Sequence, residues 1–276
     1  MMGLIGTSNG ARPRLAAGSN AKQLVGGAGR LLCTGLADAG RLTLFVGATT
    51  RRLFQRSLRG RAVLAQIEFI GARSLGVVAL SAVFTGLVLA LQGYAVLVRF
   101  GSENLVGSLV ALSLTRELAP VLTALMVTAR AGSATAATIG NMAVTEQIDA
   151  LRALAVDPQH YLVVPRLVAA VLALPLLTAM FSLAGIAAAY LFGVSVLGLD
   201  GLTFMSNVRS SLRSKDVSVG FWKALVFGAV IAWIATFRGY RTIGGAMGVG
   251  RATSRTVVES AVLILGGDYV MTALLF

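Results

Sequence analysis

The chain has 276 residues, of which 56% are apolar and only 13% are charged, and its mean hydropathy is +0.81. A soluble protein of this length could not bury so much apolar surface, so the composition excludes a soluble enzyme, a disordered chain and a disulfide scaffold. The formal net charge of +13 would indicate nucleic-acid binding in a soluble protein, but in a membrane protein it indicates basic cytoplasmic loops. One cysteine and one histidine cannot build a Cys/His zinc site, so no metal site is expected.

The N-terminal part is basic and precedes the long apolar runs. Residues 1–21 are rich in Gly, Ser, Ala and Asn without periodicity, so we expect a flexible tail. In 22–73, Arg52, Arg56 and Arg59 have the spacing of one helical stripe and lie among apolar residues. This segment predicts one or more amphipathic helices in the cytoplasmic headgroup region, with an ordinary solvated helix as the alternative.

Five apolar runs follow, and each is long enough to predict a membrane-spanning helix. The first lies between Arg73 and Arg99 and has 25 uncharged residues. As a helix it would be about 37 Å long, enough to cross a hydrocarbon core of about 30 Å. The third is interrupted by Pro175, which predicts one long or kinked span, or a span plus a re-entrant piece. In the fourth, Lys223 is expected to snorkel from one end. The expected spans are residues 74–98, 105–130, 167–199, 217–237 and 256–275.

The basic residues are distributed unevenly between the two sides of these spans. Of the 24 Lys and Arg residues, 17 lie in residues 1–73, 146–166 and 238–255, and only 5 lie in the alternate connections and their edges. The positive-inside rule therefore places the N-terminus in the cytoplasm and the C-terminus on the periplasmic side. Five spans make a thin wall for a transport path, so we expect a homodimer.

Arg116 and Glu117 lie inside the second apolar run, where charge is costly and usually faces a cavity or a partner. Nearby, Pro120 frees a backbone carbonyl one turn back. The pair predicts either a polar element of a substrate path or gate, or a structural pair that locks helices together. Asp268 in the last run is a candidate partner for the second possibility. Both remain open at this point.

The second run ends in small residues. Residues 129–140 read ARAGSATAATIG, and ten of these twelve are Gly, Ala, Ser or Thr. Gly132, Ala136 and Gly140 are spaced by four, the pattern that lets helices approach closely. We therefore expect packing at a helix or subunit interface, and regard a ligand site as the weaker interpretation.

Next comes TEQIDALRALAVDP at 145–158, which predicts a short surface helix ended by Asp157-Pro158. The chain has no GxxxxGK[ST] loop, so it has no ATP-hydrolysing site of that kind. Because it has no motor of its own, this helix predicts docking of a soluble partner, with a plain connector as the alternative. Glu146, Asp149 and Arg152 would form the charged face, and Ile148, Leu151 and Leu154 would form the apolar anchors.

Several ordered stretches resemble the MlaE/YrbE permeases, the membrane subunits of MCE-type ABC lipid transporters. The resemblance covers about residues 75–276. It departs at Ala119, where many relatives have glycine. The stretches are LQGY at 91–94, VALSLTRELAPV at 110–121, RAGSA at 130–134, TEQIDAL at 145–151, VDPQHYLVVPR at 156–166, LPLLT at 174–178 and RATSRTVVESAVLILGGDYVMTALLF at 251–276.

This resemblance implies an all-α permease domain at 74–276, with 145–158 as the coupling helix. It implies a homodimer in the bacterial inner membrane that moves phospholipid and so maintains outer-membrane lipid asymmetry. The implied partners are a cytoplasmic ABC ATPase that binds ATP and Mg, a hexameric periplasmic-facing MCE-domain protein and often a STAS-domain protein. No cofactor in this chain and no nucleic acid are expected.

The resemblance also implies site residues. The lipid path would be lined by Leu89, Tyr94, Leu97, Phe100, Arg116 and Glu117. The ATPase-coupling residues would be Glu146, Gln147, Ile148, Asp149, Leu151 and Arg152.

Two other classes of function stay open on the residues alone. One is a proton-coupled secondary transporter or channel in which Glu117, Glu259 and Asp268 form a relay, although the sequence lacks the internal repeat that many such transporters have. The other is a membrane scaffold that transports nothing.

Overall fold

A computed structural model describes residues 33, 36–53 and 59–275 of the chain. The expected tail at 1–21 and Arg56 lie outside the described residues. The chain divides into two units, Met1–Gly47 and Ala48–Phe276, and the second contains the membrane helices. Within the described residues every regular element is helical, as the sequence predicts. Arg59 has a non-helical backbone before α2, so it does not continue the predicted arginine stripe.

Five helical stretches of the described chain are long and apolar enough to span a membrane. The first, Gly60–Phe100, begins well before the expected start at residue 74. The 3-10 turn η1 (Ala72–Ser74) joins α2 to α3, so the helical path does not break at residue 73. The elements of this span are α2 (Gly60–Ile70), η1, α3 (Leu75–Leu97) and the 3-10 turn η2 (Val98–Phe100).

The second span, Glu103–Val144, contains two π-helical turns that each insert an extra residue. Such turns are frequent at functional sites. They are η4 (Leu114–Leu118) and η5 (Thr128–Gly132), and both carry charged side chains. The remaining elements are the 3-10 turn η3 (Glu103–Leu105) with helices α4 (Val106–Ser113), α5 (Ala119–Val127) and α6 (Ser133–Val144).

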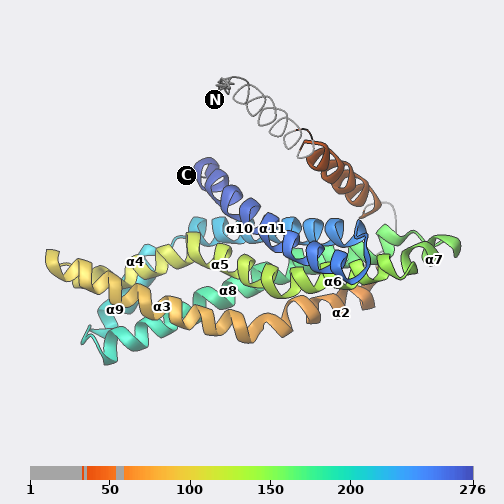
Figure 1. Cartoon of the computed structure of the whole chain (residues 1–276). Coiled ribbons are helices and arrows are strands. Elements are labelled where there is room, and N and C mark those ends of the chain that lie inside the picture. Colours follow the sequence, from red (N-terminus) through yellow and green to blue (C-terminus); the bar gives the residue numbers. More distant parts are fainter. Residues whose placement is uncertain (1–32, 34–35, 54–58, 276) are drawn as a thin grey trace, which may run out of the picture. The chain divides into compact units, whose positions relative to one another are not determined.

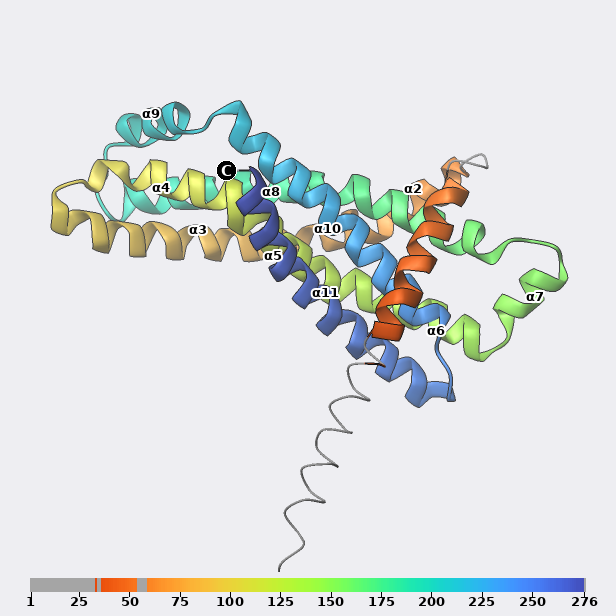
Figure 2. The same ribbon diagram turned by 90° about the horizontal axis from the view of Figure 1, so that it is seen from above.

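The third span, Gln159–Ser195, consists of the π-turn η6 (Gln159–Val163) and α8 (Val164–Ser195). Although Pro175 lies inside it, α8 is one continuous helix, which excludes the re-entrant alternative. The fourth and fifth spans are α10 (Ser214–Tyr240) and α11 (Gly245–Leu275). Two shorter helices, α7 (Gln147–Ala153) and α9 (Gly201–Ser211), connect spans at opposite ends of the bundle (Figures 1 and 2).

The centre of the bundle is α8, which packs against α2, α3, α5 and α10. Glycines allow the closest crossings. A Cβ atom on Gly86 of α3 would lie 2.1 Å from the carbonyl oxygen of Gly185 on α8. The small-residue stripe packs against a neighbouring helix as its spacing predicts, because Gly132 faces Ile231 within α10 and Gly140 faces Thr242, two residues after α10 ends.

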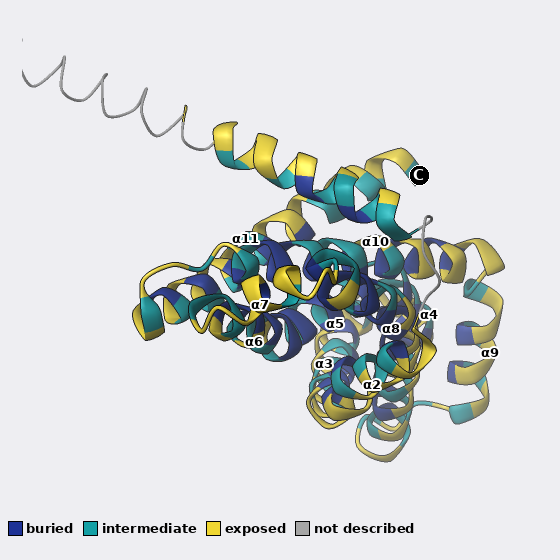
Figure 3. Ribbon diagram, turned by 90° about the vertical axis from the view of Figure 1, so that its right-hand side faces the viewer, coloured by how far each residue is buried: buried dark blue, intermediate teal, exposed yellow. Residues whose placement is uncertain are grey.

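The outer surface of the bundle is apolar, whereas an aqueous surface would be dominated by polar side chains. Exposed apolar side chains include Phe84 on α3, Leu191 on α8, Trp222 on α10 and Tyr269 on α11. Figure 3 shows the corresponding pattern, with buried positions lining the interior of the helix packing and exposed positions turned outward. This surface suits contact with lipid or with another subunit.

The glycine crossing gives a first testable prediction. Gly86→Ala must force α3 away from α8, so we expect the free energy of unfolding to fall by about 1–3 kcal/mol. Gly76→Ala is the matched control, because a Cβ atom there meets nothing within 4 Å. Helix propensity makes that control neutral or stabilising by up to about 1 kcal/mol. Thermal unfolding in detergent measures both, and equal melting temperatures would contradict the close crossing.

Candidate functional site

Pro120 shapes the polar centre of the second span. It has no N–H group, so the carbonyl of Arg116 four residues earlier loses its usual helical donor. In the structure Lys223 of α10 donates to this carbonyl, with a distance of 3.2 Å between Nζ and the oxygen. The carbonyl freed by Pro120 is therefore satisfied by a side chain from the fourth span.

Lys223 is fully buried, so the prediction that it snorkels to one end of its span is wrong. Its ammonium is hydrogen-bonded to the carboxylate of Glu117. It also lies 2.8 Å from Asp268 Oδ1 and 2.7 Å from Thr272 Oγ1, both on α11. A buried ammonium needs such partners because its desolvation is costly. This charge cluster, defined as Glu117, Lys223, Asp268 and Thr272, joins the second, fourth and fifth spans.

Arg116 is held separately from its neighbour Glu117. Its Nη2 lies 2.6 Å from Asp216 Oδ1 at the start of α10, and the Asp216 side chain is 2% exposed. The second carboxylate oxygen of Asp216 accepts from the backbone N–H of Arg213 at 2.9 Å. Both charges of η4 therefore attach it to α10, which supports the locking alternative. The side chains of Arg116 and Glu117 nevertheless stay 33% and 37% exposed, so one side of η4 remains open.

The structure divides the predicted lipid-path residues into two groups. Leu89, Tyr94 and Leu97 on α3 are partly buried and pack against the main apolar core. Phe100 lies at the end of the first span and is 75% exposed. Arg116 and Glu117 instead point to α10 and α11. Within one chain, therefore, the described contacts do not bring the six residues into one cavity.

The three acids of the proposed proton relay are likewise divided. Glu259 pairs with Arg238 at 2.7 Å, whereas Glu117 and Asp268 share Lys223. Glu259 and Asp268 are nine residues apart on α11, which corresponds to about 13 Å along the helix. Each acid that the relay requires is therefore held in an ion pair.

The sequence alone could have pointed to this pairing. Lys223 is the only charged residue between Asp216 and Arg238, and an isolated lysine in an apolar span calls for an acidic partner on another helix. The sequence does not say which of the available acids is in reach. Asp216 was also missed as a partner of Arg116, because it lies at the very edge of the predicted fourth span.

At the α7 end, the predicted coupling helix is shorter than residues 145–158. Glu146 and Ala155 flank it with left-handed backbone conformations, with φ angles of 59° and 57°. The N–H of Val156 bonds to Leu151 O and the N–H of Ala155 bonds to Arg152 O, at 3.0 and 2.9 Å. This is a Schellman motif, which stops the helix before Asp157-Pro158 is reached.

The predicted apolar anchors of this segment do not all face outward. Ile148 is 3% exposed and packs with Ile139 of α6 and Leu162 of η6, and Leu151 packs beside them. The prediction that Ile148 meets a partner is therefore corrected, because this side chain fixes α7 to its own chain, whereas Leu151 is only partly buried. Leu154 is 73% exposed and remains available.

Ion pairs hold the same end of the bundle. Arg152 lies 2.6 Å from Asp149 and donates to the hydroxyl of Tyr240 at the end of α10 at 2.7 Å. Arg52 lies 2.6 Å from Asp157. Burial alone would raise the pKa of Asp157, but the hydrogen bond and charge of Arg52 outweigh it and hold the pKa below its ordinary value. The pair is thus present at neutral pH and lost only as the pH falls through that lowered pKa.

Four predicted coupling residues remain exposed, and so do the apolar residues Leu154 and Val156 that follow them. They occupy the tip of the α7 hairpin, where Figure 3 shows mostly exposed ribbon. We call this surface the α7 tip and define it as Glu146, Gln147, Asp149, Arg152, Leu154 and Val156. It combines charged groups with exposed apolar side chains. Protein-docking surfaces have this composition, with apolar side chains at the core and polar groups at the rim.

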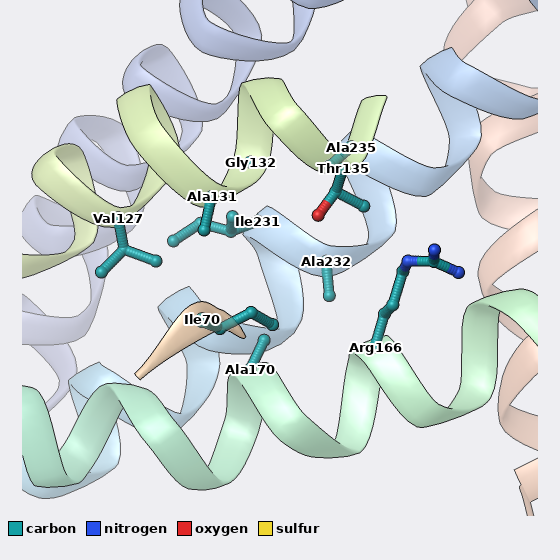
Figure 4. A pocket seen from close by; sticks show the side chains of 10 residues that line it. All are labelled: Ile70, Val127, Ala131, Gly132, Thr135, Arg166, Ala170, Ile231, Ala232 and Ala235. Atoms are coloured by element: carbon teal, nitrogen blue, oxygen red, sulfur yellow. The ribbon is translucent and has the colours of Figure 1, made fainter. Parts of the chain in front are cut away.

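A small cavity lies between α2, the second span, α8 and α10 (Figure 4). Its lining is apolar except for Thr135 and Arg166, and Arg166 donates to Leu162 O at 2.6 Å. The volume of about 10 Å³ suits a single water molecule, not a lipid. This cavity is therefore not the predicted lipid path.

The charge cluster gives a second testable prediction. Lys223→Met leaves Glu117 and Asp268 facing each other without a cation, so the free energy of unfolding should fall by about 3 kcal/mol. Lys215→Met, at the exposed start of the same helix, is the control and should change it by less than about 0.5 kcal/mol.

A triple variant separates locking from lipid contact. Lys223→Met with Glu117→Gln and Asp268→Asn removes all three charges, so it should recover most of the lost stability in thermal unfolding. If the triple variant stays as unstable as Lys223→Met alone, the ion pairs do not explain the effect. Recovered stability together with normal transport would restrict Glu117 to a locking role.

Sequence comparison identifies relatives that match most of this chain. Residues 63–274 match the family described as Permease MlaE. The chain is 43% identical over 215 residues to the intermembrane phospholipid transport system permease protein MlaE of Haemophilus influenzae, which covers 78% of this chain and 82% of that protein. It is 43% identical over 239 residues to a probable ABC transporter permease protein of Rickettsia felis, covering 87% and 92% of the two chains. It is 38% identical over 233 residues to the chloroplastic protein TRIGALACTOSYLDIACYLGLYCEROL 1 of Arabidopsis thaliana, covering 84% and 67%.

The matched region begins at residue 63 and so includes all five candidate spans almost completely. It also contains the charge cluster and the α7 tip. The Haemophilus and Rickettsia relatives are named as transport permeases, and the chain itself lacks a P-loop. This multi-pass membrane protein belongs to the MlaE family of ABC-transporter permeases.

Proposed function

We propose that this protein is the permease through which an ABC transporter moves phospholipid between the bacterial inner membrane and periplasmic carriers, maintaining outer-membrane lipid asymmetry. The observation that carries the proposal is the family match over residues 63–274 together with 43% identity to a phospholipid transport permease. Five long apolar helices supply the membrane part. ATP and Mg would be bound by a separate cytoplasmic ATPase subunit.

In this proposal the α7 end of the bundle faces the cytoplasm and the C-terminus faces the periplasm. The distribution of basic residues supports this orientation, because 17 of 24 lie in the three segments that the positive-inside rule assigns to the cytoplasm, and α7 lies in one of them, residues 146–166. Arg59, stacked 5.0 Å from the centre of the Tyr161 ring, and Arg152, beside Tyr240, are among them. Aromatic and basic side chains of this kind are typical of a membrane–water interface.

The α7 tip is the proposed contact with the ATPase. A coupling element must be exposed, yet it must also be rigidly attached to the helices that it moves. Ile148 attaches α7 to Ile139 on the second span and Leu162 on the third, and Arg152 attaches it to Tyr240 on the fourth. A displacement of the tip would therefore act on three spans at once.

The lipid path needs a second copy of the chain in this proposal. In one chain the α3 residues and the open side of η4 lie apart, and α11 leaves large apolar side chains such as Val262 and Tyr269 exposed. A homodimer would cover part of that surface and enclose a central cavity lined by both groups. The MCE-domain protein would then meet the α9 end, and a STAS-domain protein would join on the cytoplasmic side.

The proton-relay alternative has less support than this assignment. Lys223 forms ion pairs with both Glu117 and Asp268, and Arg238 forms an ion pair with Glu259. Protonation of these acids during each relay cycle would leave the buried Lys223 ammonium and Arg238 without their carboxylate partners, which is costly.

Purification of the full chain from its native membrane tests the proposed function. We expect an ATPase subunit and bound phospholipid to co-purify, and lipid transfer to depend on ATP. Lipid or ion flux that follows a proton gradient without ATP would support the relay instead. If neither flux nor an ATPase subunit is found, the membrane-scaffold alternative remains.

A charge-reversal variant tests the docking surface. Glu146→Lys with Asp149→Lys places repulsive charge on the α7 tip, and we expect the affinity for the ATPase to fall about tenfold or more, by the energies usual for close interfacial charge pairs. Glu103→Lys, at the opposite end of the bundle, should leave the affinity unchanged. A complex of normal affinity and ATP turnover in the double variant would remove the α7 tip from the proposed interface.

A further inference from the structure

A second cavity, much larger than the first, opens on the side of the bundle. It lies between residues 175–186 of α8, Thr115 of η4 and residues 212–221, which run from the end of α9 into α10, and its volume is about 270 Å³. Gly220 allows α10 to approach η4 closely here, because a Cβ atom would lie 2.5 Å from the carbonyl oxygen of Thr115. We call this space the α8–α10 groove.

The groove has the dimensions and surface of a site for a lipid chain. The twelve-residue stretch of α8 along it is about 18 Å long, just over half of a hydrocarbon core of about 30 Å. Its rim is apolar and faces outward, with Leu183, Val217 and Phe221 between 50% and 68% exposed. In a membrane protein such a rim borders the bilayer, so lipid is the molecule available to occupy the groove.

One polar group in the lining has no partner. Thr178 is 5% exposed, and its hydroxyl makes no hydrogen bond within the described residues. Its neighbour Ser182, by contrast, donates to Thr178 O at 3.1 Å in the usual helical manner. A buried hydroxyl without a partner costs about 1–3 kcal/mol. An acceptor oxygen on a molecule in the groove would remove that cost.

A cation directly follows one of the lining residues in the chain. Arg213 is exposed and directly follows Leu212 in the lining. Within the described part of the chain its guanidinium has no carboxylate partner, because the nearby Asp216 carboxylate pairs with Arg116. A guanidinium in this position is suited to a phosphate group.

We propose that the α8–α10 groove binds one phospholipid of the surrounding bilayer, with an acyl chain along α8, a lipid oxygen accepting from Thr178 and the phosphate at Arg213. A phospholipid carries an apolar chain, ester oxygens and a phosphate in one molecule, which matches the three features of the groove. The site lies within a single chain. It depends only on the protein being embedded in a membrane, and it holds whether or not the proposed transport function is correct.

Photolabelling of the full chain tests this site. The protein is reconstituted into vesicles of phosphatidylethanolamine and phosphatidylglycerol that contain a phospholipid with a diazirine on its acyl chain. After irradiation, mass spectrometry locates the adducts, which we expect to concentrate on residues 175–186 and 212–221. Adducts spread evenly over the exposed faces of α3, α8, α10 and α11 would overturn the proposal.

Two tryptophan variants of α8 test whether the labelling depends on the groove itself. Ala179→Trp fills the groove, so labelling of its lining should fall about fivefold, which corresponds to about 1 kcal/mol of lost binding. Leu191→Trp adds the same side chain to an exposed position of α8 outside the groove and should leave labelling unchanged. Equal labelling in both variants would overturn the proposal. Melting temperatures show whether each variant remains folded.

The phosphate contact is tested separately, by comparing the labelling of the protein by two lipid probes. With a phospholipid probe and a diacylglycerol probe that carry the same diazirine chain, wild-type protein should label more strongly with the phospholipid. Arg213→Gln should abolish that difference without affecting folding. No preference in the wild-type protein would exclude the phosphate contact. If Ala179→Cys forms a disulfide between two copies and the groove takes no lipid label, a second chain occupies the groove and the proposal is wrong.

Discussion

A buried ammonium organises the polar interior of this membrane protein. The charge of Lys223 could not be retained inside a bilayer unless several oxygen atoms surrounded it. The second span supplies a carboxylate and a backbone carbonyl, and the fifth supplies a carboxylate and a hydroxyl. Pro120 contributes to this coordination because it leaves the Arg116 carbonyl free to accept from Lys223. The position of three spans relative to one another thus follows from the coordination of one side chain.

Close helix packing provides the frame around this cluster. Without a water-driven hydrophobic force between helices in a bilayer, packing depends on small residues that bring backbones together. Gly86 and Gly185 provide one such crossing between α3 and α8, and Gly220 provides another between α10 and η4. Where side chains do not close the space between α8 and α10, the groove remains.

The α7 tip and the charge cluster are attached to the same helices. Tyr240, which binds Arg152 of the α7 tip, and Lys223 are both on α10, and Ile139 and Glu117 are both on the second span. Tyr240 and Lys223 are separated by 17 residues, or about 25 Å of helix. If the α7 tip receives the ATPase as proposed, its motion reaches the polar centre through two continuous spans. The π-turns η4 and η5 interrupt regular helix within one of them, and such turns offer positions where a helix can change register.

The sequence by itself determined the helical class, the five apolar spans, the uneven charge distribution and the segment that becomes α7. These follow from local composition and from periodicity, which act within one helix. It also singled out Arg116, Glu117 and Asp268 as costly charges. Only the tertiary structure decided their partners, because ion pairing depends on which helices become neighbours. For the same reason, only the structure showed that Lys223 is buried between two acids, that Ile148 faces inward and that α8 crosses the bundle without a break at Pro175.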